Sequence, residues 1–176
     1  MDELDDILTP LSTWLKEKRK VAIATVISTW GSAPRPVGGQ MAIDINGEII
    51  GSVSGGCIEG AVISEGIKSI KDRRTRVKDY GISNHLAWEV GLACGGELKV
   101  LIQPLNIEDN IVYSMIKLIK SRKPIKLEVD CITGERLINN SLTNETSSYD
   151  KLTNKFIHII APHPRLFIIG AVHIAQ

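Results

Sequence analysis

The 176-residue sequence lacks the features that mark several large classes of protein. It has only three cysteines and no C-x-x-C pair, which excludes a disulfide framework and a cysteine zinc site. No apolar run approaches the roughly 20 residues of a membrane helix, and the acidic start MDELDDILTP is no signal peptide. A formal net charge of +1 gives no global attraction to nucleic acid or to an anionic membrane. We therefore expect a cytoplasmic protein with reduced thiols that binds neither nucleic acid nor membrane.

Positive charge is concentrated in two short runs, KEKRK at residues 16–20 and KDRRTRVK at residues 71–78. Both runs lie at the ends of predicted helices, where cations complement the helix dipole. Such isolated basic clusters are typical of solvated surface, and we interpret both runs in that way.

The spacing of apolar residues predicts both helices and strands. Helices are expected over residues 4–15, 58–70 and 107–118, and strands over 21–29, 75–80, 97–105 and 155–160. One hairpin is expected at Asn46-Gly47, as a type I′ turn, and another at Thr133-Gly134. The Ser/Thr/Asn-rich residues 141–154 are expected to form an exposed loop. The fold class is thus α/β, with an α+β-like N-terminal domain in which helices flank a mixed sheet.

The end of the sequence, KFIHIIAPHPRLFIIGAVHIAQ, has a different character from the rest. A continuous apolar strand runs into a turn at Gly170, which is how a nucleotide-binding βαβ unit begins. We therefore expect a first domain over residues 1–150, followed in residues 151–176 by a linker and the first strand and turn of an incomplete Rossmann-like domain. NAD(P) binding is not expected, because this domain is incomplete; Val172 also stands where such a turn has its second glycine.

The stretch GSVSGGCIEG, residues 51–60, lies where a strand should pass into a helix. The backbone amides of Gly55 and Gly56 could converge on an anion at the positive end of that helix. The same position would push the Cys57 thiol toward the thiolate, the form that binds metals or attacks sulfur, and Glu59 would cap the helix start. Alternatively, the glycines only make a tight turn and Cys57 is a small buried residue.

Other residues could belong to the same site. The stretch ACGGE repeats the pattern with Cys94, Gly95 and Gly96, and Arg35 is held between two prolines, where it could clamp a phosphate. His85 could line the site, although a loop histidine is more commonly just solvated. Cys131, inside a predicted strand, is interpreted as structural.

Four motifs in this order, GSAPRPVGGQM, GSVSGGCIEGAV, GLACGGELKVLIQPL and PRLFIIGAVHIAQ, resemble the XdhC/CoxI family of accessory factors for xanthine dehydrogenase and related molybdenum hydroxylases. The resemblance implies an accessory protein, rather than an enzyme, that binds molybdenum cofactor and assists its sulfuration and insertion. The implied partners are the hydroxylase and a cysteine desulfurase-type sulfur donor, and a second copy of the chain is also considered.

The resemblance also implies which residues would meet the cofactor: Arg35, Gly55, Gly56, Cys57, Glu59, Cys94, Gly95 and Gly96. Cys57 and Cys94 are the two that could contact the metal, because soft thiolates suit it. Two alternatives stay open at this point. One is a sulfur-transfer enzyme with Cys57 as nucleophile, and the other is a truncated, inactive remnant or interaction module.

Overall fold

The computed structural model describes residues 3–81, 96–106, 110–139 and 146–162. Within these residues, three helices and nine strands follow one another along the chain. Their order is α1 (Glu3–Lys16), β1 (Val21–Trp30), β2 (Gln40–Asp44), β3 (Ile49–Gly51), α2 (Glu59–Asp72), β4 (Arg76–Tyr80), β5 (Glu97–Pro104), α3 (Ile111–Lys120), β6 (Ile125–Asp130), β7 (Arg136–Asn139), β8 (Ser148–Asp150) and β9 (Lys155–Ile160).

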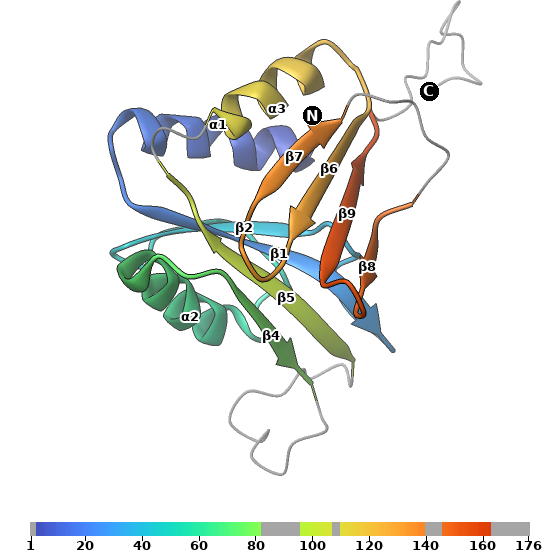
Figure 1. Cartoon of the computed structure of the whole chain (residues 1–176). Coiled ribbons are helices and arrows are strands. Elements are labelled where there is room, and N and C mark those ends of the chain that lie inside the picture. The colour runs from blue at the N-terminus through green and yellow to red at the C-terminus, as the bar shows by residue number, and fades with distance from the viewer. Residues whose placement is uncertain (1–2, 82–95, 107–109, 140–145, 163–176) are drawn as a thin grey trace, which may run out of the picture.

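The strands form two sheets, each antiparallel throughout its described pairings (Figure 1). The first sheet has the order β3-β2-β1-β5-β4 and the second the order β7-β6-β9-β8. The α2 helix covers one face of the first sheet, while α1, α3 and the second sheet lie on the other side of it (Figure 1). The α+β character is thus confirmed, whereas the expected mixed sheet is wrong for the described strands, because no parallel pair occurs among them.

Strand β1 lies in the middle of this arrangement and explains the apolar run from Val21. Alternate residues point to opposite faces of a strand, so Val21 and Ile23 join the core with α1, α3 and the second sheet, while Ala22 and Ala24 join the core with α2. Both faces of β1 are therefore buried. A β-bulge at Ile27 interrupts the pairing with β5. Such a bulge bends the strand and increases its local twist.

Several local predictions are confirmed and several need correction. The helix over 58–70 and the strands over 21–29, 75–80, 97–105 and 155–160 are present, with ends that differ by no more than two residues. The expected loop over 141–154 contains the short strand β8, and β9 lies between β6 and β8 in the second sheet. The third helix begins only at Ile111, after Asn110, and residues 107–109 lie outside the described part.

The hairpin between β2 and β3 has a different turn from the one predicted. Gly47 has a positive φ of 86°, but Asn46 does not, and a type I′ turn requires both. The Gly47 amide donates to the Asp44 carbonyl, and the Asp44 carboxylate accepts from the amides of Asn46 and Glu48. Asp44 is therefore what closes the turn, as a type I turn followed by a left-handed glycine.

The predicted strand RLFIIG and the Gly170 turn lie outside the described residues, so the incomplete Rossmann-like unit and the division at residue 150 stay predictions. Among the described residues, no helix combines the length and apolarity needed to cross a bilayer.

A buried polar cluster lies between the two sheets. Gln40 and His158 line a small cavity of about 20 Å³, together with Thr25 and Gln103. The Gln40 amide donates to the Thr25 hydroxyl at 3.1 Å, but the Gln40 Oε1 and His158 Nδ1 atoms have no partner among the described residues. Burial lowers the pKa of His158 to about 4, because the charged imidazolium is poorly solvated there.

The buried His158 should make the protein less stable in mild acid. The pKa of His158 is about 4 in the folded state, compared with an ordinary value of 6.5. Between pH 6.5 and pH 4, the histidine is therefore protonated in the unfolded chain but neutral in the folded protein. The histidine contribution to stability is thus fully present above pH 6.5, declines as the pH falls, and levels off near pH 4 after a loss of about 3 kcal/mol. Urea unfolding across this range should show the decline in the parent and a smaller one in His158→Leu. An equal decline in both proteins would contradict this assignment.

Candidate functional site

Three of the predicted motifs meet at one end of the first sheet. We call residues 31–39 the proline loop and residues 52–58 the glycine–cysteine loop. The proline loop leaves β1 at Trp30 and enters β2 at Gln40, and Trp30 pairs with Glu97, where β5 begins. The ends of β1, β2 and β5 therefore place the proline loop and the two described residues of the ACGGE stretch, Gly96 and Glu97, at the same end of the sheet.

The approach of these segments is close enough to require glycine. A methyl group on Gly96 would lie 3.0 Å from the Ser32 carbonyl carbon and 3.1 Å from the Ala33 nitrogen, closer than side chains normally approach backbone. A methyl group on Gly55 would lie 3.9 Å from the Pro34 Cβ, which is ordinary contact. The proline loop thus touches the glycine–cysteine loop on one side and Gly96 on the other.

The glycine–cysteine loop is organised by a single buried carboxylate, that of Glu59. Its Oε1 atom accepts from the Ser52 hydroxyl at 2.6 Å and the Ser54 amide at 2.9 Å. Its Oε2 atom accepts from the Ser54 hydroxyl at 2.5 Å and the Gly56 amide at 2.9 Å. Glu59 is the first residue of α2, so its charge also lies at the positive end of that helix.

The two serines hold the remaining amides of the loop. The Ser52 Oγ atom accepts from the Gly55 amide at 2.8 Å, and the Ser54 Oγ atom accepts from the amides of Cys57 and Ile58 at 3.1 and 3.0 Å. Such serine contacts to amides three and four residues ahead are a common way to start a helix. Sequence reasoning missed both serines, although Ser54 stands four residues before the N-cap residue, Ile58.

These bonds change the interpretation of the glycine pair. Gly55 and Gly56 have φ values of 76° and 116°, so the loop does need glycines, as expected from an anion-binding turn. However, the anion that the Gly56 amide holds is the carboxylate of Glu59, and the Gly55 amide is held by Ser52. An external phosphate would have to displace groups from the chain itself to bind there.

The ionisation of Glu59 follows from the same contacts. Burial alone would raise its pKa, but the hydrogen bonds from Ser52 and Ser54 together outweigh it and lower the pKa to about 2. The carboxylate therefore remains charged at every pH at which the protein is expected to work. A group so fully hydrogen-bonded and so acidic suits a structural role better than proton transfer.

The cysteines have contrasting surroundings. Cys57 is a free, exposed thiol at the tip of the glycine–cysteine loop, so the alternative that it is a small buried residue is wrong. Cys131 is a free, buried thiol, and burial raises its pKa to about 11, which agrees with its predicted structural role. Cys94, Gly95 and His85 lie outside the described residues.

Arg35 and Trp30 are two further side chains at the end of the first sheet where the proline loop lies. Arg35 is half-buried in the middle of the loop. Trp30 is 71% exposed, directly before the loop, and sequence reasoning did not single it out. A large apolar ring with this exposure is a candidate stacking surface for a ligand. Among the described residues, no group of three or more His, Cys, Asp or Glu side chains could hold a metal ion.

Comparison with known proteins agrees with the motifs. The XdhC and CoxI family matches residues 14–81, which include Arg35, both loop glycines, Cys57 and Glu59. The resemblance inferred from the motifs is thus found independently over this part of the chain. The match does not extend to residues 94–96.

Individual relatives are longer than this chain, which spans about half of their length or less. It is 25% identical to a probable xanthine dehydrogenase subunit of Bacillus subtilis (strain 168), covering 93% of this chain and 56% of that protein. It is 29% identical to the molybdenum cofactor insertion chaperone PaoD of Escherichia coli (strain K12), covering 66% of this chain and 36% of PaoD.

A solved structure supports the fold. The crystal structure of a xanthine dehydrogenase from Bacillus halodurans superposes with a TM-score of 0.67 at 20% identity, covering 92% of this chain and 53% of the other.

Replacing Glu59 should test its role in holding the loop. In Glu59→Gln, one carboxylate oxygen is replaced by an NH2 group, which cannot accept the two hydrogen bonds that the oxygen accepts in the parent. The two donors are then left without a partner, and an unpaired buried donor is costly. We expect the free energy of unfolding to fall by about 2–3 kcal/mol. Urea unfolding measures this loss, and limited proteolysis within residues 52–58 should become faster.

Glu65→Gln is the matched control, because it makes the same change in the same helix. Glu65 is half-buried and forms ion pairs with Lys68, Arg76 and Lys78, none of which belongs to residues 52–58. Because two of these partners are well-exposed lysines, Glu65→Gln should cost less free energy of unfolding than Glu59→Gln and should leave proteolysis of the loop unchanged. Equal losses in both variants would show that the Glu59 hydrogen bonds do not hold the loop.

Proposed function

We propose that this chain is an accessory protein, rather than an enzyme, that receives molybdenum cofactor as cargo and assists its sulfuration and insertion into a xanthine dehydrogenase-type hydroxylase. The family match and the likeness to a molybdenum cofactor insertion chaperone support this proposal. The hydroxylase and a cysteine desulfurase-type sulfur donor are the proposed partners, in the cytoplasm.

The observation that carries the proposal is the exposed Cys57 thiol on a loop with a fixed backbone. Four hydrogen bonds to Glu59 and three to the serines hold that loop, so the thiol has a defined position. A cofactor with a metal and dithiolene sulfurs suits a soft thiolate ligand. Because the thiol is exposed and its loop is already ordered, cargo can bind and leave without refolding of the site.

The remaining contacts are divided among the other predicted residues. Arg35 is the proposed partner of the cofactor phosphate, since a guanidinium binds phosphate through two parallel hydrogen bonds. Gly55 and Gly56 are proposed to shape the loop and to let cargo approach its exposed side. Gly96 is proposed to fix the neighbouring segment, in which Cys94 is the second candidate ligand and Gly95 its neighbour. Glu59 acts through the loop and not by touching the cofactor.

Replacing the thiol should release the cargo. When the protein is purified from cells that make molybdenum cofactor, we expect Cys57→Ser to retain at least about fivefold less molybdenum and pterin than the parent, because a hydroxyl is a poor ligand for a soft metal. Metal analysis and pterin fluorescence after oxidation measure the two components.

Cys131→Ala is the control, because it removes the other described thiol, which is buried. It should retain cargo as the parent does, after both proteins are shown to be folded by circular dichroism. Full retention of molybdenum and pterin by Cys57→Ser would contradict the assignment of this thiol as a ligand.

The exposure of Cys57 also favours a second candidate function, transfer of sulfur to the cofactor. In that reaction, the Cys57 thiolate attacks the outer sulfur of a persulfide on the donor protein. A new S–S bond forms on Cys57, the donor S–S bond breaks, and the donor cysteine leaves as a thiolate. No external oxidant is needed, because the sulfane sulfur is passed on at the same oxidation level.

Mass spectrometry separates this candidate from a purely binding role. Incubation with a cysteine desulfurase and cysteine should add about 32 Da, the mass of one sulfur atom, to the peptide that contains Cys57, and reductant should remove it. The Cys57→Ser protein serves as the blank. An unmodified Cys57 peptide under conditions that load the desulfurase itself would exclude the transfer reaction.

A further inference from the structure

The two basic runs of the sequence come together at the opposite end of the first sheet from the proposed cofactor loops. Lys20 directly precedes β1, whereas Lys71 and Arg73 lie at the end of α2. Strand β1 has ten residues and therefore separates this end from the proline loop by about 30 Å. The proposed function does not account for this second basic region.

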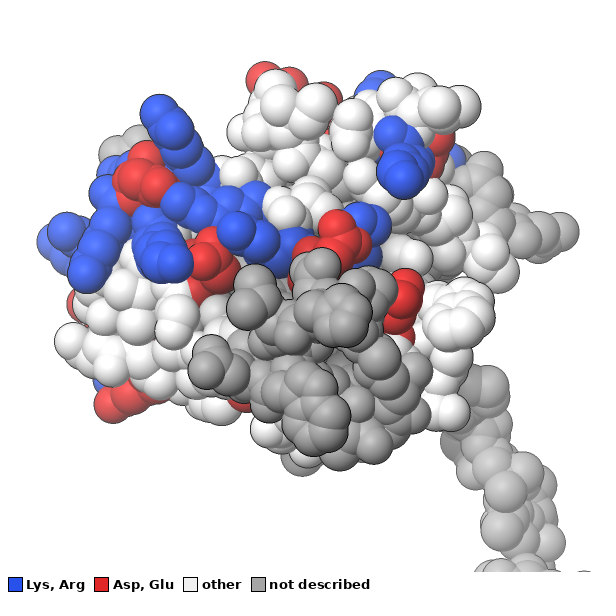
Figure 2. All heavy atoms as spheres, turned by 90° about the horizontal axis from the view of Figure 1, so that it is seen from below, with Lys and Arg blue, Asp and Glu red and all other residues white. Residues whose placement is uncertain are grey.

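Two of the four arginines in the runs are already paired with acidic side chains. Arg19 forms ion pairs with Glu17 and with Glu48, and Arg76 pairs with Asp72 and Glu65. Figure 2 shows such mixed charge, with acidic side chains among the lysines and arginines on this side of the molecule. Surface pairs of this kind agree with the prediction of a solvated basic face.

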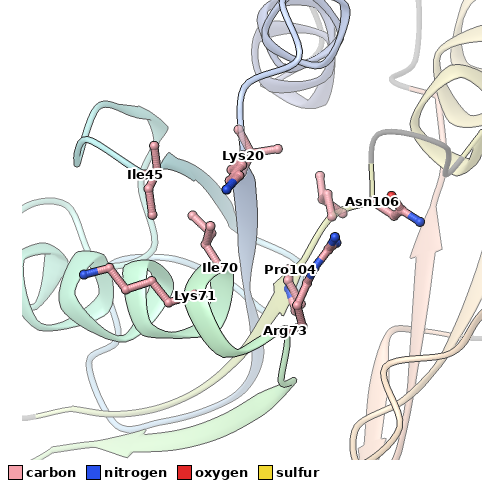
Figure 3. Close-up of a pocket in the computed structure, with 9 residues that line it drawn as sticks. Lys20, Ile45, Ile70, Lys71, Arg73, Pro104 and Asn106 are labelled. Carbon is pink, nitrogen blue, oxygen red and sulfur yellow. The ribbon is translucent and has the colours of Figure 1, made fainter.

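Lys20, Lys71 and Arg73 behave differently, because none of them forms an ion pair with an acidic residue in the described part of the chain. All three line one pocket of about 310 Å³ (Figure 3). One concave site is thus lined by three cations from the two runs, although the runs are about 50 residues apart in sequence.

The pocket has one polar side and one apolar side. In Figure 3 the nitrogen ends of Lys20 and Arg73 flank the space beside Ile70, while Lys71 extends away from it. Buried Ile70 and Leu105 form part of the apolar wall. No Asp or Glu is among the described residues that line the pocket. Its volume lies at the lower end of the range for small-molecule sites.

The backbone of Arg73 supplies a second observation. Arg73 ends α2 in the left-handed conformation, with φ 61° and ψ 28°, where glycine is strongly preferred. Lys18 and Arg122 share this conformation just beyond α1 and α3, but only at the end of α2 does it place a cation against the pocket. The same position also brings the carbonyl end of α2 near the pocket, and the charges of Lys20 and Arg73 outweigh its partial negative charge.

We propose that this pocket binds a small phosphorylated molecule with an apolar body. The guanidinium of Arg73 and the ammonium of Lys20 receive the phosphate, and the wall of Ile70 and Leu105 covers the apolar part. A phosphate matches this arrangement because it offers oxygens to both cations at once and carries enough charge to satisfy them. The site does not depend on the cofactor role proposed for the loops at the other end of the sheet.

Phenyl phosphate is a direct probe of this pocket, because it joins a phosphate to a small apolar ring. Titration into the ¹⁵N-labelled full chain should shift the amide resonances of Ile70, Arg73 and Leu105 with a millimolar dissociation constant. Phenol should leave these resonances in place, and inorganic phosphate should bind more weakly than phenyl phosphate. Raising the salt concentration should weaken the binding, since the cations are exposed.

Arg73→Gly is the decisive variant, because glycine suits the left-handed conformation and should leave the fold at least as stable. It should weaken phenyl phosphate binding about fivefold, in keeping with loss of one exposed charge-assisted contact. Lys18→Gly is the matched control: Lys18 also has a positive φ, 59°, just beyond α1, but it does not line the pocket. Its loss removes the same charge and should change the affinity less than about twofold.

Two results would overturn the proposal. One is that phenyl phosphate shifts none of the three resonances at millimolar concentration. The other is that Arg73→Gly and Lys18→Gly weaken binding equally, which would mean that the probe responds only to overall charge. Neither result would bear on cargo retention by Cys57, so the two proposals fail or stand separately.

Discussion

The Glu59 carboxylate is the interaction on which the candidate site depends. Its two oxygens hold hydroxyls and amides from residues 52–56, and the serine oxygens in turn hold the amides that lead into α2. Without this charge, a segment with two left-handed glycines would have little to define its shape. The ordered loop fixes the backbone position of Cys57 while leaving its thiol exposed. A cysteine on a flexible segment would lack the fixed position, and a buried cysteine would lack the exposure.

Sequence reasoning located this loop but misread its electrostatics. The glycine pair, the helix start and the nearby acid were all visible, and each was assigned correctly to a strand-to-helix junction. The pattern could not show that the acid reaches back into the turn, because the same amides serve an internal carboxylate as well as an external phosphate. The feature of the sequence that indicated an internal carboxylate was the pair of serines, Ser52 and Ser54. Their hydroxyls supply the additional hydrogen-bond donors that a buried carboxylate needs.

The fold shows a similar division between what was predictable and what was not. Apolar periodicity is a local property, and it identified α1, α2 and the long strands. The two predicted hairpins are the local pairs β2–β3 and β6–β7. Pairings such as β1–β5 and β6–β9 join segments that are distant in sequence, so the strand order of both sheets did not follow from the pattern. The near-continuous apolarity of β1, which is typical of parallel strands, here reflects layers packed on both faces of an antiparallel strand. The short strand β8 was missed because its composition is that of a loop.

The contact between Gly38 and His158 connects the second sheet to the candidate site. A methyl group on Gly38 would lie only 2.6 Å from the His158 Nε2 atom, so the proline loop rests directly against the imidazole ring of β9. The size of that ring therefore limits how closely the proline loop can approach the second sheet. The position of Arg35, three residues before Gly38, is thus adjusted from a strand that contributes no residue to the site. Evolution could retune the site by changing the size of one core side chain in the second sheet while leaving every proposed cofactor contact unaltered.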